Sequence, residues 1–149
     1  MQTNWLFLSC LNMYWILLSL VCMSFLQQPK SLDDFRWEKR IIVVFDSPGF
    51  DQTWIKSHQK ELEERKLLLV HVSAGKIQWK NLEEELAEKS FVKLLQNLKS
   101  GENWLLIGLD GGIKNQGAGA VPMESLMRQI DSMPMRQSEI RRINGKDGM

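Results

Sequence analysis

The sequence predicts a small α/β domain in which a four-stranded mixed sheet carries helices on both faces, behind an apolar N-terminal leader. Two patterns point to this fold class. Short runs rich in Val, Ile and Leu alternate with longer segments of helical periodicity. The short runs are apolar at every position, which is typical of strands that are covered on both faces. With 149 residues, the chain has room for one domain of ordinary size.

The leader occupies residues 1–26. No side chain is charged before Lys30, and residues 5–26 are about as long as a bilayer span, which takes roughly 20 residues. We expect a cleaved secretory signal, because Cys22 and Ser24 offer small residues for the cut. The alternatives are a retained membrane anchor and a lipid attached to Cys22. The protein is therefore predicted to be exported, periplasmic or secreted, with membrane attachment as the alternative.

Composition excludes two classes of function. The chain has 19 basic and 18 acidic residues, so it lacks the strong positive charge of a nucleic-acid-binding domain. Its two cysteines, Cys10 and Cys22, both lie in the leader. The domain behind the leader therefore has no thiolate for disulfide exchange or peroxide reduction.

Residues 31–135 are predicted to form the domain. Residues 32–37 (LDDFRW) read as a lead-in with Phe35 and Trp37 tucked under the domain. The β-branched run at residues 40–45 (RIIVVF) predicts the first strand. Asp51 can cap a helix that runs to about residue 65, with apolar and aromatic side chains four residues apart on one face, namely Trp54, His58 and Leu62.

The second half of the domain continues the alternation. A strand is expected at residues 66–72, then a helix at residues 81–99 that begins with a capping box of Asn81 and Glu84. A third strand is predicted at residues 104–109. A hairpin turn at residues 110–112, a short strand from Ile113 and a last helix from Pro122 to just before Pro134 complete the domain. Residues 136–149 are expected to be a polar, basic, frayed tail.

The predicted order is β-α-β-α-β-β-α. Right-handed crossovers make the first two strands parallel neighbours, and the hairpin supplies the last two. A βαβ unit followed by a ββα unit is the minimal thioredoxin-like plan.

Four segments carry a family resemblance: LDDFRW, RIIVVF, LIGLDGGIK and above all IDSMPMRQSEIR, near the end of the domain. With them the chain resembles the bacterial domain-of-unknown-function family 4174, the prokaryotic arm of the DUDES group of peroxiredoxin-like domains. The resemblance covers about residues 31–142. It implies a thioredoxin-like fold and a setting outside the cytoplasm, as in the matrix and sushi-repeat proteins of the eukaryotic relatives. It implies no activity.

In this plan one rim of the sheet gathers the ends of the first two strands and the start of the third. The rim would hold Asp46, Ser47 and Pro48, His71, and Glu102 with Asn103, while the Asp110 turn would lie on the opposite rim. Redox relatives place a cysteine on this rim, but the sequence here reads FDSPGFDQTW, and Gly101-Glu102-Asn103 stands where such relatives carry a cis-proline. The nucleophiles left are hydroxyls without a matched base.

Two functions stay open. The first is a non-redox binding domain whose rim takes a protein or glycan partner outside the cytoplasm. The second is an enzyme without thiol chemistry, hydrolytic or metal-dependent, in which Asp46, Ser47, His71 and Glu102 are weak candidates for catalysis. Asp46 adjoins Ser47, which is awkward for a triad. Two widely spaced histidines, His58 and His71, are not a ligand signature, so no metal or cofactor is predicted.

Overall fold

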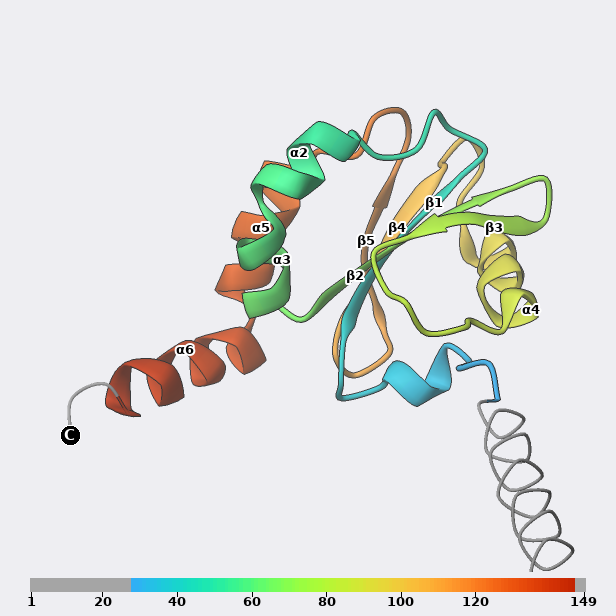
Figure 1. The fold of residues 1–149 in the computed structure, drawn as a ribbon. Helices are drawn as coiled ribbons and strands as arrows, with labels where there is room; N and C mark the ends of the chain where they lie inside the picture. Colours follow the sequence, from blue (N-terminus) through green and yellow to red (C-terminus); the bar gives the residue numbers. More distant parts are fainter. Residues whose placement is uncertain (1–27, 147–149) are drawn as a thin grey trace, which may run out of the picture.

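The computed structural model describes residues 28–146, and Figure 1 shows them as one five-stranded sheet with helices on both sides. The predicted leader, residues 1–26, lies outside the described residues. Within the described part of the chain, no helix has both the length and the apolar character that a bilayer crossing needs.

The sheet has the strand order β3-β2-β1-β4-β5. Strand β1 (Arg40–Phe45) pairs in parallel with β2 (Leu67–Ser73) and antiparallel with β4 (Trp104–Ile107). Strand β5 (Ile113–Gly117) forms an antiparallel hairpin with β4. The predicted arrangement of these four strands is therefore confirmed. The prediction of four strands in total is wrong, because β3 (Lys76–Lys80) adds a fifth at the edge beside β2.

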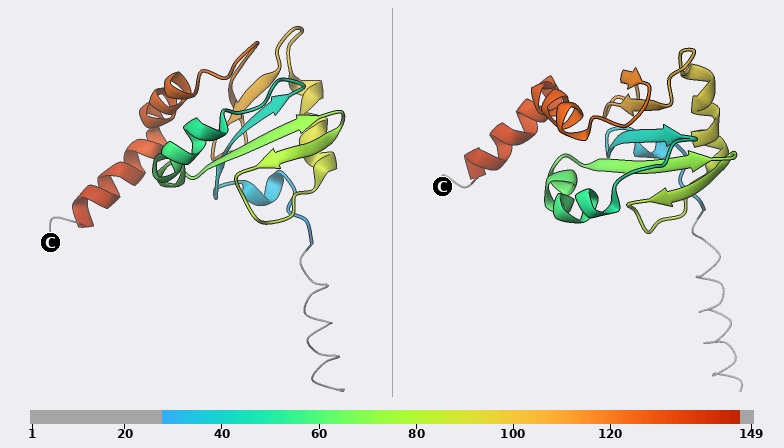
Figure 2. Two further views of the ribbon diagram at one scale, coloured as in Figure 1. Left: turned by 45° about the horizontal axis from the view of Figure 1, so that its top comes forward. Right: turned by 90° about the horizontal axis from the view of Figure 1, so that it is seen from above.

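Helices cover both faces of the sheet, as predicted (Figures 1 and 2). One face carries α2 (Gln52–Ser57), α3 (Gln59–Glu64) and α5 (Met123–Ser132). The other face carries η1 (Asp33–Phe35), α4 (Glu88–Val92) and η2 (Lys93–Asn97). Because side chains alternate along a strand, Ile41 and Val43 pack under η1 and α4, whereas Ile42 and Val44 pack under α2 and α5. All six residues of β1 are buried.

The predicted helix over residues 81–99 is wrong in its first half. Residues 76–80 form β3, and helical structure begins only at α4. Asn81 does not cap a helix. Its side-chain oxygen accepts from the Leu69 backbone N–H at 2.8 Å, and its side-chain amide donates to the Leu67 carbonyl at 3.1 Å, so Asn81 continues the pairing with β2.

A bulge sets the two faces of β3. Val72 pairs with Ile77 and its neighbour His71 pairs with Trp79, so Gln78 is the extra residue on β3. Ile77 consequently packs on the cluster beneath α4, and Trp79 packs on the cluster beneath α2.

Three smaller predictions also need correction. Phe35 is buried as expected, but Trp37 is 57% exposed. The helix after Asp51 is divided at His58 into α2 and α3. The tail is not frayed over residues 136–146, because α6 (Pro134–Lys146) begins directly after α5 and extends away from the sheet in Figure 2. Its Arg136 is only 4% exposed.

Candidate functional site

Backbone hydrogen bonds bring together the three segments of the predicted rim. The Phe45 N–H donates to the Asn103 carbonyl at 2.7 Å, and the Asp46 N–H donates to the Val72 carbonyl at 3.0 Å. The end of β1, the end of β2 and the residue before β4 are thus neighbours. Asp110 lies at the other end of the sheet, in the β4–β5 turn.

The side chains of the weak catalytic candidates do not converge. The Asp46 carboxylate accepts from the Ser73 hydroxyl and the Ala74 N–H, each at 3.1 Å, and so ties the β2–β3 turn to the end of β1. The Glu102 carboxylate accepts from the Lys99 N–H at 3.3 Å within its own turn. Among the hydrogen bonds of the described residues, none joins Asp46, Ser47 and His71 as a triad would require.

His71 lies beneath the loop that follows β1. A Cβ atom built on Gly49 would be 3.0 Å from the His71 Nδ1 atom, so any other residue there would press on the ring. His71 also faces Trp79 across the β2–β3 pair. Its Nε2 atom is buried without a partner. The half-buried ring is therefore packed between the loop and β3, and it does not line the cleft described below.

His58 occupies a different environment. Its ring stacks on Trp54 with the centroids 4.1 Å apart, and its Nδ1 atom lies 2.9 Å from both the Trp54 carbonyl and the Ser57 hydroxyl. In the part of the chain that the structure describes, no three His, Cys, Asp or Glu side chains are grouped as ligands for a metal ion.

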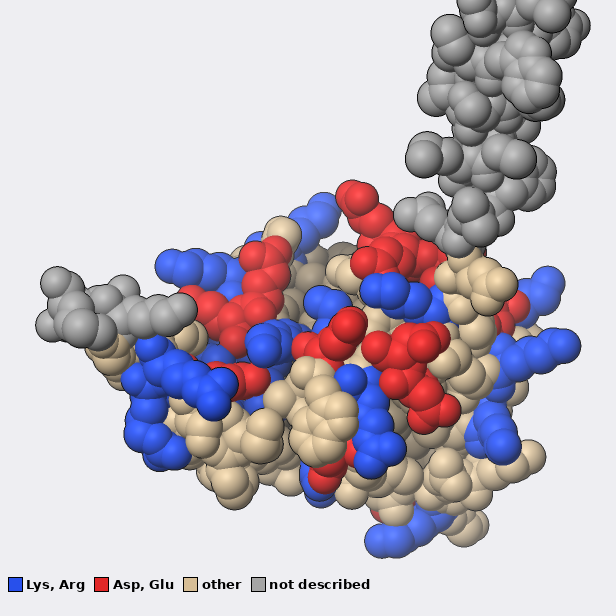
Figure 3. Space-filling model, turned by 90° about the horizontal axis from the view of Figure 1, so that it is seen from below, with Lys and Arg blue, Asp and Glu red and all other residues tan. Residues whose placement is uncertain are grey.

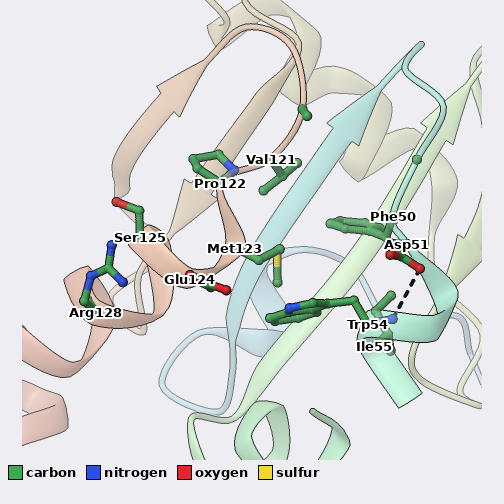
Figure 4. Close-up of a pocket in the computed structure, with 12 residues that line it drawn as sticks. Phe50, Asp51, Trp54, Ile55, Val121, Pro122, Met123, Glu124, Ser125 and Arg128 are labelled. Carbon is green, nitrogen blue, oxygen red and sulfur yellow. Dashed lines mark hydrogen bonds between the residues drawn. The ribbon is translucent and has the colours of Figure 1, made fainter. Parts of the chain in front are cut away.

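The cleft at this end of the molecule lies beside the candidates rather than among them. It has a volume of about 530 Å³ and runs between the loop that enters α2 and the start of α5. In Figure 4, Phe50 and Trp54 come from one side, and Val121, Pro122 and Met123 face them from the other. The remaining labelled residues are Asp51, Ile55, Glu124, Ser125 and Arg128.

Local sequence explains both walls of the cleft. Asp51 caps α2 as predicted: its carboxylate accepts from the Thr53 N–H at 2.8 Å and from the Trp54 N–H at 3.2 Å. The cap fixes the first turn, from which Trp54 faces the cleft (Figure 4). On the other wall, Pro122 precedes the first residue of α5 and cannot donate a backbone hydrogen bond. The Met123 side chain then points toward Trp54 (Figure 4).

The chemistry of the cleft is that of a binding surface. The apolar side chains Phe50, Trp54 and Met123 are only partly buried, so part of their surface is available to a ligand. Phe50 is held in place by Trp79, with the ring centroids 5.8 Å apart. The cleft wall from α5 was missed by sequence reasoning, which placed Pro122 correctly but did not bring it near Phe50. The available signal was the apolar Val121-Pro122-Met123 run just before an amphipathic helix.

Comparisons with known proteins identify a family but no activity. One solved structure is similar: the solution structure of the reduced form of the N-terminal domain of PilB from N. meningitidis. It is 15% identical, covers 72% of this chain and 93% of its own, and superposes with a TM-score of 0.30, which is too low to support an argument. None of the curated proteins matches significantly. The profile of the domain of unknown function DUF4174 matches residues 31–139, well over half of the chain. The protein is thus a member of the DUF4174 family.

Proposed function

We propose that this protein is a non-redox binding domain that acts outside the cytoplasm and holds an apolar side chain of a protein partner in the cleft between α2 and α5. The observation that carries the proposal is the cleft itself, about 530 Å³ in volume and bounded by Phe50, Trp54 and Met123. A cavity of this size, largely apolar with a few polar groups at its margin, is typical of a binding site.

The position of the cleft supports the absence of redox chemistry. The strand order and the helices on both faces fit a thioredoxin-like plan, in which redox members carry the reactive cysteine in the loop after the first strand. Here that loop is Asp46-Ser47-Pro48-Gly49-Phe50, and no cysteine occurs after Cys22. The loop contributes an aromatic wall to the cleft instead of a thiolate.

The lining favours a protein partner over a glycan. A sugar needs several polar groups to pair with its hydroxyls, whereas the two walls of the cleft are mainly the apolar surface of Phe50, Val121 and Met123. The thioether of Met123 adapts to side chains of different shape. The charged residues Asp51, Glu124 and Arg128 also line the cleft and would select the orientation of the partner.

A photo-crosslinking amino acid at Ser125 tests this proposal in the protein's own cells. Ser125 is exposed and lines the cleft. We expect a covalent adduct with one protein, reduced about tenfold or more by Met123→Asp, because a carboxylate in an apolar site is costly to desolvate. The matched variant Met123→Leu should retain the adduct.

The control position is Gln96, which is exposed on η2 at the other face of the sheet. A crosslinker there should not trap the same partner. The proposal fails if the Ser125 adduct is unaffected by Met123→Asp, if it contains a glycan instead of a protein, or if it does not form.

A further inference from the structure

A second hollow lies at the opposite end of the sheet, where β1 begins. It has a volume of about 370 Å³ and is bounded by Arg40, by the β4–β5 turn and by Met133, Pro134 and Met135, where α5 ends and α6 begins. Figure 3 shows this end of the molecule, where positive and negative side chains are interspersed with uncharged surface. The hollow belongs neither to the predicted rim nor to the cleft between α2 and α5.

Arg40 is only partly satisfied in this hollow. It is 1% exposed, and its Nη1 atom donates to the Arg65 carbonyl at 2.8 Å and to the Glu139 carboxylate at 3.2 Å. Its Nε and Nη2 atoms are buried without a partner. The N–H groups of these two nitrogens point in the same direction on the planar guanidinium, and this edge is the one that pairs with both oxygens of a carboxylate. Two buried N–H donors without an acceptor lower the stability of the fold.

The charges around Arg40 do not balance. Three guanidinium groups lie together, two of them buried and the third largely covered: the side chains of Arg40, Arg136 and Arg65 are 1%, 5% and 13% exposed. In the described part of the chain, two carboxylates pair with them at distances of 3.3 Å or less, those of Asp131 and Glu139. Lys66 and Glu61 are about half exposed and opposite in sign, so they offset each other. The buried cluster therefore holds one positive charge in excess, which a monovalent anion would neutralise.

The mouth of the hollow offers an apolar surface to the rest of such an anion. Trp37 lines it and is 57% exposed, and Met135 beside it is 50% exposed. The backbone of Trp37 has a φ of 68°, an unusual conformation for a bulky residue, and its N–H is held by the Leu109 carbonyl at 2.6 Å. The cation of Lys114 is already paired with Asp110 at 2.6 Å, and this pairing lowers the pKa of the Asp110 carboxyl. Of the two cations that line the hollow, Arg40 is thus the one with donors free for a ligand; Arg36, outside the lining, lies 5.9 Å from the centroid of the Trp37 ring.

We propose that this hollow binds a small organic acid. The carboxylate pairs with the Nε and Nη2 atoms of Arg40, and the apolar body lies between Trp37 and the methionines Met133 and Met135. Because both nitrogens are covered in the structure, a side chain must move on binding, and the unbranched Met133 and Met135 can do so at little cost. A single negative charge matches the excess of one, and the apolar mouth disfavours an inorganic anion.

The test is calorimetric titration of the full-length protein with phenylacetate and with its neutral analogue phenylacetamide. We expect saturable binding of phenylacetate and at least about tenfold weaker binding of the amide, since a bidentate pair with a charged group is lost. Trp37→Ala, a change of an exposed side chain, should weaken phenylacetate binding about fivefold or more through lost stacking. Trp54→Ala, in the other cleft, should leave it unchanged.

Arg40→Lys keeps the charge but removes the planar fork, and should weaken phenylacetate about tenfold. If this variant of a buried residue fails to fold, the titrations with phenylacetamide and with Trp37→Ala still test the proposal. The proposal is overturned if phenylacetate shows no saturable binding at millimolar concentration, if the amide binds equally well, or if Trp37→Ala has no effect. Equal binding of inorganic phosphate would also overturn the assignment to an organic acid.

Discussion

Gly49 and His71 illustrate how a single contact decides whether a residue is a catalytic candidate. The sequence correctly brings His71 to the end of β2, next to the loop after β1. The sequence does not show how near that loop lies to the ring. Gly49, which has a φ of 81°, lies directly over the imidazole. The contact joins residues 22 positions apart in the sequence (71 − 49). Local patterns carry no information on such a contact, whereas the Asp51 cap is local and was predicted.

Gly49→Ala is expected to lower the free energy of unfolding by more than Gly75→Ala. Both glycines have a positive φ, 81° and 72°, so both variants incur the left-handed penalty of about 1–2 kcal/mol. Only at Gly49 does the new Cβ press on His71, which adds about 1–3 kcal/mol of overpacking. Urea denaturation of the two variants measures the difference. If both variants lost the same free energy of unfolding, the His71 ring would have to move aside freely.

At the scale of single elements, the mistaken helix over residues 81–99 shows how leucine spacing misleads. Leu82, Leu86, Leu94 and Leu98 have helical spacing and do reach the core cluster beneath α4, yet of the four only Leu94 lies in a helix. Residues 83–85 are three successive exposed glutamates, which suit a helix surface and a loop equally. The segment is instead fixed by long-range bonds that no local pattern encodes: those of Asn81 to β2, and those of the Lys30 backbone to Glu85 and Ala87.

Asn81→Ala should therefore destabilise the protein although the residue is outside every helix and strand. The change leaves the Leu69 N–H and the Leu67 carbonyl without their side-chain partner, at a cost of about 1–3 kcal/mol. Asn97→Ala, at an exposed position in η2, should change stability by less than about 0.5 kcal/mol. Thermal unfolding, monitored by circular dichroism, compares the stability of the two variants. Similar losses from both variants would contradict the role of Asn81.

Helix α6 gives the second prediction at this scale, because it is attached by charges rather than by an apolar face. Glu139 accepts from Arg40 at 3.2 Å and lies 3.4 Å from Lys66, and Arg136 donates to the Glu64 carbonyl at 2.7 Å. A chain that ends at Met135 should lose about 3–5 kcal/mol of stability, since it leaves the buried guanidinium of Arg40 without its carboxylate partner Glu139. A chain that ends at Ile140 keeps these contacts and should unfold like the whole protein. Equal stability of the two truncated chains would show that α6 is dispensable.

At the scale of the whole molecule, the sheet separates two hollows with different chemistry. The end where β1 finishes presents an apolar cleft, and the end where β1 begins presents a buried guanidinium. The sequence predicted the four-strand core and its helical covering, since those depend on hydrophobic pattern. It did not predict either hollow, because each is made by segments that meet only in the folded chain, such as Phe50 with Val121 and Arg40 with Met133.

Export is a prediction for the whole chain. We expect the protein from its own cells to appear in the soluble exported fraction with a mass that lacks about the first two dozen residues, as for a cleaved signal. Such a product would contain neither cysteine. Intact-mass spectrometry combined with cell fractionation makes the measurement. A full-length mass in the membrane fraction would instead establish an anchored protein.

The bulge in β3 has a consequence for solubility. An edge strand presents unpaired backbone groups to any other chain, and a flat, regular edge is a template for aggregation. Here the edge strand is five residues long, begins and ends with a lysine, and is interrupted by the extra residue Gln78. A second molecule that tried to extend the sheet would meet two positive charges and a break in the ladder. The same irregularity that places Trp79 beside Phe50 thus also makes this edge of the sheet a poor template for another chain.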